Sequence, residues 1–340
     1  MKKIYFLLLF VCSSLLSYAD GLTASLQSGD ELSVYFGSNA FQDAYAEAKA
    51  GDTITLSSGM FNGLATGGVV KPITIIGTYG MNPKDSKATS IQTLTIFGKN
   101  VKVEGICFTT LTIGKAENVT IKRCYMETLA GGSSGDHTNT LIDQCCITKE
   151  DKAIYTGINY AIKNSTIERF SGTRSSDRIA NITNCCIHDI WYSTPYAIYK
   201  NNIMMANNPS TSSYNENVWI YFYAGSELYN NYFILTCTYN YVSNHPVKID
   251  FRTGCITENN ILSPMRYQSD YPDFKFPNTD DYTAFGDQYD AGMDGKPVGI
   301  TGGSGFNEYP AIPRIVSASI DMQNDDEGKL NASLKVKAER

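Results

Sequence analysis

The amino-acid sequence predicts an all-β protein built as a parallel β-helix, a solenoid of stacked coils. Two observations carry this prediction. A six-residue pattern (apolar, any, often Asn, any, any, apolar) recurs through the middle of the chain, with most repeats close to 20 residues apart. The 340 residues also include 23 Tyr and 28 Gly against 3 His, and aromatic residues and glycine favour strands and turns over helices.

Composition and charge narrow the class of protein. Hydrophobic residues make up 42% of the chain and charged residues 18%, which argues against a disordered chain because enough apolar surface can be buried to offset the entropy of ordering. Lys and Arg number 28 against 34 Asp and Glu, a net charge of −6. Such a chain offers no broad basic surface, so we expect no nucleic-acid partner.

Residues 1–19 have the three parts of a secretory signal peptide. Lys2 and Lys3 precede an apolar run over 4–16, and the segment ends in small residues up to Ala19. We therefore expect cleavage after about Ala19 and a secreted or extracytoplasmic protein, at the cell surface or in the periplasm. No apolar run reaches the roughly 20 residues that span a bilayer, so no transmembrane segment is predicted.

Residues 20–51 are predicted to form an N-terminal segment and a cap helix. Apolar residues recur at helical spacing from Ala40 to Lys49, and Asn39 with Gln42 fits a capping box. Gly51 would end the helix. A helix at this place would cover the open end of the first coil, whose strand edges would otherwise invite aggregation.

The coils are predicted over residues 52–262. Equivalent strands of successive coils stack about 4.8 Å apart, so equivalent residues form ladders. The third residue of each hexapeptide lies at a bend, where Asn tolerates left-handed backbone angles. We therefore expect a structural Asn ladder there. The third residues are Gly105, Arg123, Gln144, Asn164, Asn184, Asn201, Asn231 and Asn259.

The cysteines follow the same repeat. Cys124, Cys145 and Cys185 share the fourth position, and the fifth is shared by Cys107, Cys146 and Cys186. Residues two coils apart are too distant to bridge, which excludes a disulfide between Cys145 and Cys185. Bridging of Cys124 to Cys145 stays open, although buried thiols are favoured. The spacing gives no zinc site, so no metal site is predicted. The pairing of Cys237 and Cys255 is left unassigned.

Residues 263–340 are predicted to form a loop-rich C-terminal cap with terminal strands. The stretch 263–305 is rich in Asp, Tyr, Pro and Gly and holds no repeat. Strands are expected over 312–320 and 330–338, joined by a turn at 324–328. Carboxylates of the late loop could offer oxygen ligands to Ca²⁺, but their spacing does not match a calcium-binding loop.

The opening coils resemble a known family. The chain passes from the expected helix into Gly51-Asp52-Thr53-Ile54-Thr55-Leu56, Lys71-Pro72-Ile73-Thr74-Ile75 and Val101-Lys102-Val103-Glu104-Gly105. This order resembles the pectin-lyase-like superfamily, in particular relatives of chondroitinase B and alginate lyase, and uncharacterised secreted bacterial β-helix proteins. The resemblance implies a right-handed β-helix.

The resemblance also implies polysaccharide chemistry. Lyases of the superfamily use Lys or Arg to abstract a proton beside a uronic acid carboxylate, often with Ca²⁺ held by acidic residues. Only loose candidates for the base occur, namely Lys149 or Lys152 and Arg174 or Arg178. The Gly-His-Gly and Trp-Ile-Asp-His strings of other members are absent.

A first set of candidate residues follows one coil. His188 and Asp189 come directly after a hexapeptide, and Trp191 and Tyr192 are close behind. A histidine beside an acid could act in catalysis, and the rings could form a platform for a sugar. The alternative is that Asp189 only satisfies His188 at a bend. A Gly-rich excursion before His137 could likewise project over a binding face, or be a solvated turn.

A second set lies later in the repeats. Lys248, Asp250 and Arg252 alternate along an expected strand and would share one face, where they could grip an anionic sugar or form an ion-pair ladder. His245 precedes them as a further binding candidate. An alternating aromatic stripe could stack on sugar rings or pack as a structural ladder. The stripe consists of Trp219, Tyr221 and Tyr223.

The sequence thus predicts a secreted monomer that binds or processes a polysaccharide, acidic or plant-type, without a complete catalytic site. If the protein is an enzyme, it is expected to be a polysaccharide lyase or a glycoside hydrolase. The alternative is a non-catalytic interaction module that binds glycans or a protein partner.

Overall fold

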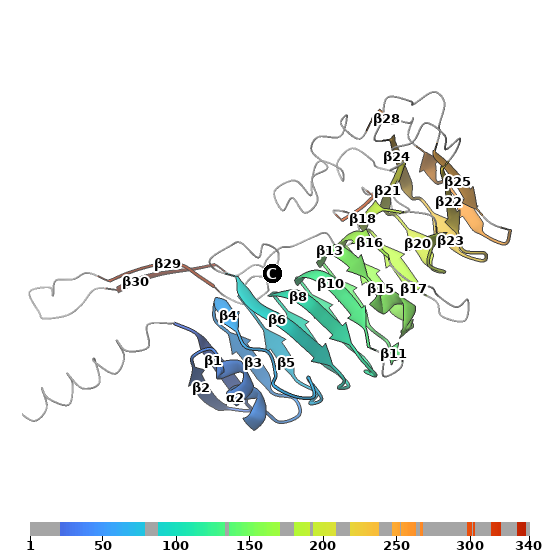
Figure 1. Cartoon of the computed structure of the whole chain (residues 1–340). Coiled ribbons are helices and arrows are strands. Elements are labelled where there is room, and N and C mark those ends of the chain that lie inside the picture. The colour runs from blue at the N-terminus through green and yellow to red at the C-terminus, as the bar shows by residue number, and fades with distance from the viewer. Residues whose placement is uncertain are drawn as a thin grey trace, which may run out of the picture.

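The protein is a parallel β-solenoid. The computed structural model describes residues 21–78, 88–132, 136–170, 180–190, 193–208, 218–237, 247–251, 253–262, 266–267, 298–300, 302, 314–320 and 332–337. Equivalent strands of successive coils pair in parallel and build two long sheets, which we call sheet A and sheet B (Figure 1). The predicted fold class is confirmed, while the right-handed turn stays a prediction. The expected signal peptide lies outside the described residues.

Sheet A has twelve described strands; the first two pairings in spatial order are antiparallel, and the other pairings are parallel. In spatial order they are β2 (Glu31–Phe36), β1 (Thr23–Ser28), β3 (Thr53–Leu56), β5 (Thr74–Ile76), β7 (Lys102–Glu104), β9 (Thr120–Lys122), β12 (Leu141–Asp143), β15 (Tyr160–Lys163), β17 (Ala180–Thr183), β20 (Ile198–Lys200), β23 (Glu227–Tyr229) and β26 (Ile256–Glu258).

Sheet B has eleven described strands. In spatial order they are β4 (Gly59–Phe61), β6 (Thr89–Ile96), β8 (Ile106–Ile113), β10 (Tyr125–Gly131), β13 (Cys146–Asp151), β16 (Thr166–Arg169), β18 (Cys186–Asp189), β21 (Ile203–Asn208), β24 (Tyr232–Cys237) and β27 (Ile261–Leu262), with β28 (Arg266–Tyr267) also beside β24.

The solenoid also contains two smaller parallel sheets. A third sheet consists of β19 (Ser193–Thr194), β22 (Val218–Phe222) and β25 (Val247–Phe251), and a two-stranded sheet pairs β11 (His137–Thr138) with β14 (Gly157–Ile158). A 3-10 helix, η1 (Ala153–Tyr155), lies between the strands of this last pair in the chain.

The core is a set of apolar ladders between the sheets. Because side chains alternate along a strand, one residue of each short strand points inward. In sheet B the inward row is Phe61, Ile91, Phe108, Met126, Ile147, Ile167, Ile187, Met204 and Phe233, and every member is at most 2% exposed. Ile54, Ile75, Val103, Ile121 and their successors form the matching row of sheet A. These rows are the two apolar positions of the hexapeptide.

The bend between sheets A and B confirms the repeat, with one correction. Its residues have left-handed backbone angles in every described coil from Arg123 onward, with φ between 45° and 55°. In the seventh hexapeptide the left-handed residue is Asn230, so the predicted third position, Asn231, is wrong by one residue. Leu228 and Tyr229 are both apolar enough to begin the repeat, and the backbone turns Leu228 inward because it aligns with Tyr199.

The side-chain ladder lies one residue after the predicted one. Asn202 donates from Nδ2 to Oδ1 of Asn231 at 2.9 Å, and Asn231 donates in the same way to Asn260 at 2.9 Å. Earlier coils hold Cys124, Cys145, Ser165 and Cys185 at this position, which is fully buried. The left-handed asparagines therefore set the bend, while the next residue satisfies the backbone inside it.

A second asparagine ladder, which the sequence reading missed, runs outside the coils. Asn118 donates to Asn100 at 3.1 Å, Asn139 to Asn118 at 3.0 Å and Asn159 to Asn139 at 2.7 Å. Each of these asparagines has a left-handed backbone. They mark the bend that leads into sheet A.

The cysteines of the repeat are buried thiols. Cys124 and Cys145 are not bridged, and the other repeat cysteines are also thiols. Burial raises the pKa of Cys185 to about 12 and raises the pKa of Cys145 well above its ordinary value. Cys255 is a half-buried thiol, and the side chain of Cys237 lies outside the described part of the chain.

The predicted N-terminal helix is present as α2 (Ala40–Glu47), which packs against β1 and β2. The capping box is wrong: Asn39 makes no side-chain cap hydrogen bond, and Gln42 donates instead to the carbonyl of Gly63 at 2.6 Å. Within the described residues, the helices are too short or too polar to cross a membrane.

The predicted C-terminal strands are present as β29 (Arg314–Ile320) and β30 (Ala332–Lys337), which pair antiparallel. They form a sheet of their own. The roles of this hairpin and of α2 as caps stay predictions. The expected turn at 324–328 lies outside the described residues.

Candidate functional site

The outer face of sheet B presents two rows of side chains. The residue before each inward position gives a first outward row, and the residue after it gives a second. The first row runs through Met60, Ser90, Cys107, Tyr125, Cys146, Thr166, Cys186 and Ile203. The second row runs through Gln92, Thr109, Glu127, Thr148, Glu168, His188, Met205 and Ile234.

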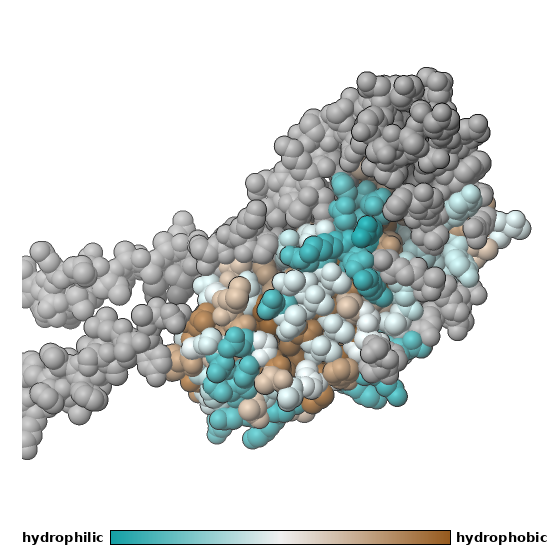
Figure 2. All heavy atoms as spheres, viewed as in Figure 1, coloured by the Kyte–Doolittle hydropathy of each residue, from teal (hydrophilic) through white to brown (hydrophobic). Residues whose placement is uncertain are grey.

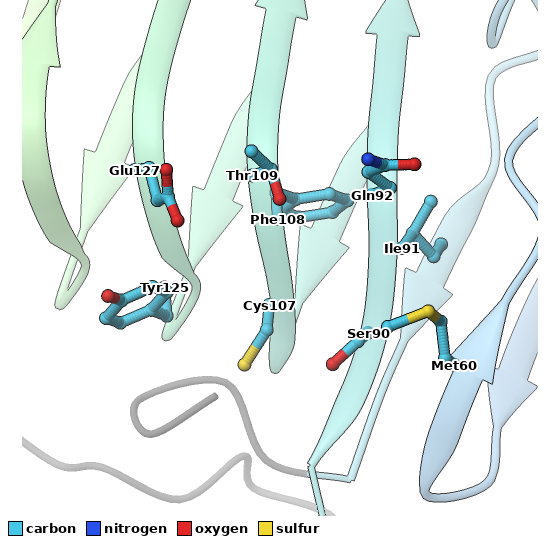
Figure 3. Close-up of a pocket in the computed structure, with 9 residues that line it drawn as sticks. All are labelled: Met60, Ser90, Ile91, Gln92, Cys107, Phe108, Thr109, Tyr125 and Glu127. Carbon is cyan, nitrogen blue, oxygen red and sulfur yellow. The ribbon is translucent and has the colours of Figure 1, made fainter. Parts of the chain in front are cut away.

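A groove of about 310 Å³ lies between these rows at β4, β6, β8 and β10. Figure 3 shows Gln92, Thr109 and Glu127 along one side and Ser90, Cys107 and Tyr125 along the other, with Met60 at the end. Of these residues, Met60 is 70% exposed. The groove therefore combines an accessible thioether, a ring, hydroxyls, an amide and one carboxylate.

The groove carries little net charge. Glu127 forms an ion pair with Lys149, which lies on the neighbouring strand β13. The hydroxyl of Thr148 donates to the phenol oxygen of Tyr125 at 3.3 Å, and burial raises the pKa of Tyr125 above its ordinary value. The phenol thus stays neutral, and the lining suits a ligand rich in hydroxyl groups.

A polar cluster follows on the same face at β16 and β18. His188 Nδ1 lies 3.2 Å from one carboxylate oxygen of Glu168 and 3.3 Å from the other. Arg169 and Asp189 are register partners on the same two strands. Burial raises the pKa of Asp189, and the negative charge of Glu168 raises it further. We call Glu168, His188 and Asp189 the acid–histidine cluster, and it can hold a proton next to a carboxylate.

Figure 2 shows how polarity is distributed on the visible face of the solenoid. Hydrophilic side chains gather across the middle of the stack, and hydrophobic atoms show toward the β1–β4 end. This agrees with the rows of sheet B, where the exposed Met60 lies at the β4 end and acidic and basic side chains follow from β10 to β18.

The second predicted set lies on the third sheet. The register pairs Trp219 with Lys248 and Tyr221 with Asp250, so the aromatic stripe and the charged alternation share neighbouring positions of β22 and β25. Tyr223 is 38% exposed, and its ring lies 6.3 Å from that of Tyr196. The side chains of Trp219, Lys248 and Asp250, and the whole of Trp191, Tyr192, His245 and Arg252, lie outside the described part.

The structure also places the residues of two weaker expectations. His137 does not project over a binding face: it is fully buried, its Nε2 donates to the carbonyl of Ala153 at 2.9 Å, and its Nδ1 lies 2.8 Å from the hydroxyl of Thr140. Lys149 and Lys152, the loose candidates for a lyase base, are paired with Glu127 and Glu150. Arg174 and Arg178 lie outside the described residues.

The sequence reading missed the groove and Glu168. Neither corresponds to a recognisable sequence motif. Glu168 directly follows its hexapeptide, as His188 directly follows the next one. Aligning the residue after each hexapeptide would have placed Glu127, Glu168 and His188 in one row.

The described residues hold no group of three or more His, Cys, Asp or Glu side chains placed to bind a metal ion. Comparisons of the chain with protein-family models, with curated proteins and with solved structures found no match.

Proposed function

We propose that the protein binds an extended polysaccharide along the outer face of sheet B, with the groove over β4–β10 as its main subsite. The observation that carries this proposal is the groove itself, an open depression of about 310 Å³ that continues into a row of polar side chains across the stacked coils. A repeating ligand suits a repeating surface, because each coil offers equivalent positions about 4.8 Å apart.

The lining favours a neutral, hydroxyl-rich glycan at this subsite. The ring of Tyr125 can lie against the apolar face of a sugar. Its hydrogen bond with Thr148 can stay in place when the sugar binds. Gln92 and Thr109 are exposed and supply donors and acceptors. The single charged lining residue that the structure describes, Glu127, is neutralised by Lys149.

The resemblance of the opening coils to the pectin-lyase-like superfamily supports the same proposal, since members of that superfamily act on polysaccharides. The signal-peptide pattern of residues 1–19 supports an extracytoplasmic location, where such ligands occur. Membership of the superfamily, the right-handed turn and secretion are parts of this proposal.

The test is isothermal titration of the purified protein with neutral and uronic polysaccharides. We expect Tyr125→Ala to weaken binding about two- to tenfold, because the contribution of an aromatic contact is roughly 0.5–1.5 kcal/mol. The matched control is Tyr229→Ala, which removes a partly buried tyrosine from the outer face of sheet A. Equal affinities for the wild type and Tyr125→Ala would refute the subsite. A protein that binds none of the glycans would refute the function and leave a protein-binding module.

Glycan cleavage is a second candidate function. A glycoside hydrolase needs one protonated carboxyl group and one carboxylate on either side of the reacting bond. Asp189, whose pKa is raised by burial and by the negative charge of Glu168, lies beside Glu168 and His188. New reducing ends from a bound glycan, lost in Asp189→Ala, would support hydrolysis. Ultraviolet-absorbing unsaturated ends would instead indicate a lyase.

A further inference from the structure

A late piece of the chain lies on the outer face of sheet B. We call residues 298–300 and 302 the strap. The N–H of Gly299 donates to the carbonyl of Asn201 at 2.7 Å. Asn164 donates from Nδ2 to two strap carbonyls, at 3.1 and 2.8 Å. Asn201 and Asn164 are bend residues of different coils, so the strap runs across the coils and is fixed at two levels of the stack.

The strap covers the late part of the face with apolar side chains. Val298 and Ile300 form a hydrophobic cluster, separate from the main core, with residues of β18, β21 and β24. These residues are Cys186, Ile203, Met205 and Ile234. Met205 is 1% exposed and Ile234 is fully buried, although both belong to the second outward row. The second row is therefore closed at β21 and β24, whereas the first row is already buried at Cys146, Thr166 and Cys186.

The second row and the first residue of the first row are open at the other end of the stack. Gln92 and Thr109 are exposed, and Met60 is 70% exposed. Going along the second row, His188 is followed directly by Met205, which lies beneath the strap. Among the described residues, the acid–histidine cluster is thus the last accessible polar group of the second row before the strap closes that row.

We propose that the strap is an end wall and that the acid–histidine cluster binds the terminal sugar unit of the glycan. This inference rests on the proposed function and adds that the protein recognises chain ends. A chain that continued along the second row past His188 would meet the strap, whose Val298 and Ile300 side chains are packed against Met205 and Ile234. A terminal sugar carries a hydroxyl that an internal unit uses for its linkage. The Glu168 carboxylate can accept a hydrogen bond from that hydroxyl, and His188 stands next to it.

The test compares linear hexasaccharides of β-1,4-linked glucose, xylose and mannose in three forms: free, reduced to the alditol, and methylated at the non-reducing end. For the sugar that binds, we expect one of the two end modifications to weaken binding at least tenfold. Both modifications leaving affinity within twofold would overturn the inference and leave the proposed function intact. Binding of none of these sugars or of the parent polysaccharides would overturn both.

A strap variant provides a second arm. Gly299 has φ of 82°, and a Cβ added there would lie 2.7 Å from Cδ1 of Ile203. The G299A/I300S variant, which also removes the apolar side chain of Ile300, should therefore displace the strap. The matched control is Gly67→Ala, which has φ of 73° and open space around its Cβ. We expect end modification to change the affinity of the strap variant less than threefold, whereas Gly67→Ala keeps the wild-type response.

Two adjacent methionines report whether the strap has moved without unfolding. Met205 lies under the strap, and Met204 lies in the main core. In the strap variant, peroxide should oxidise Met205 and leave Met204 intact. If Met205 becomes oxidised in this way and the variant still discriminates against the modified end at least tenfold, the strap is not the end wall and the inference fails.

Discussion

The side-chain ladder inside the bend gives a quantitative prediction for Asn202→Ala. Asn202 accepts a hydrogen bond from the N–H of Cys185 at 2.8 Å and donates from Nδ2 to the carbonyl of Ile182 at 2.9 Å. It also donates to Asn231 Oδ1, which still accepts from the backbone N–H of residue 202 after the change. Truncation therefore leaves the buried N–H of Cys185 without its partner, while the carbonyl of Ile182 loses one hydrogen bond and keeps the parallel pairing of β17 with β20. At about 1–3 kcal/mol for the unsatisfied N–H and about 0.5–1.5 kcal/mol for the second hydrogen bond, the loss is roughly 1.5–4.5 kcal/mol.

The assay is equilibrium urea unfolding followed by far-UV circular dichroism. Asn139→Ala is the control, because Asn139 lies on the exposed ladder with φ of 52° and should cost only about 1–2 kcal/mol through its left-handed backbone. Asn202→Asp should be at least as damaging as Asn202→Ala, since it presents a buried oxygen to the Ile182 carbonyl. If Asn202→Ala costs no more than Asn139→Ala, the ladder does not hold the late coils together.

Three further predictions follow from burial and charge. Burial raises the pKa of Cys185 to about 12, so neither this thiol nor Cys145 should be alkylated in the native protein at pH 8. Both thiols should react in denaturant without reductant. A disulfide-bridged peptide detected by mass spectrometry would contradict this. Gly157→Ala should lower stability by about 1–3 kcal/mol, since the new Cβ would lie 2.9 Å from that of Tyr160, and an unchanged melting temperature would refute that packing. Because its pKa is raised, Asp189 keeps its proton to a higher pH than an ordinary aspartate. Glycan binding through this donor should therefore weaken as pH rises through that pKa, and Asp189→Asn should flatten the dependence of affinity on pH. An identical pH dependence in the variant would show that Asp189 does not take part in binding.

Much of the fold could be predicted because the solenoid repeats its own signal. A single hexapeptide is weak, but eight of them, the first six at steps near 20 residues, indicate parallel stacking, and the inward row from Phe61 to Phe233 confirms it. The error at Asn231 arose where the spacing lengthens to 29 residues between Asn201 and Asn230, so that two neighbouring apolar residues could begin the repeat. The register there is decided by the pairing of β23 with β20 in the previous coil. A local sequence pattern holds no information about that pairing.

The candidate site was harder to predict because it depends on rows across coils. His188 and Asp189 were selected as an adjacent pair, yet the close partner of His188 is Glu168 from the preceding coil. Conversely, His137 stood in a Gly-rich stretch that looked exposed, and its burial follows from contacts with Thr140 and Ala153. The strap lay in a segment without any repeat, and only the tertiary structure places it on sheet B.

The most direct test of the central claim is a footprint of the groove with bound glycan. Met60 is 70% exposed at the β4 end of the groove, and Met204 is buried in the core as an internal reference. With a glycan bound at saturation, the account predicts that peroxide oxidises Met60 at least about threefold more slowly, because the sugar covers the thioether. Unchanged oxidation of Met60 at saturating glycan would show that the polysaccharide binds elsewhere and would contradict the account.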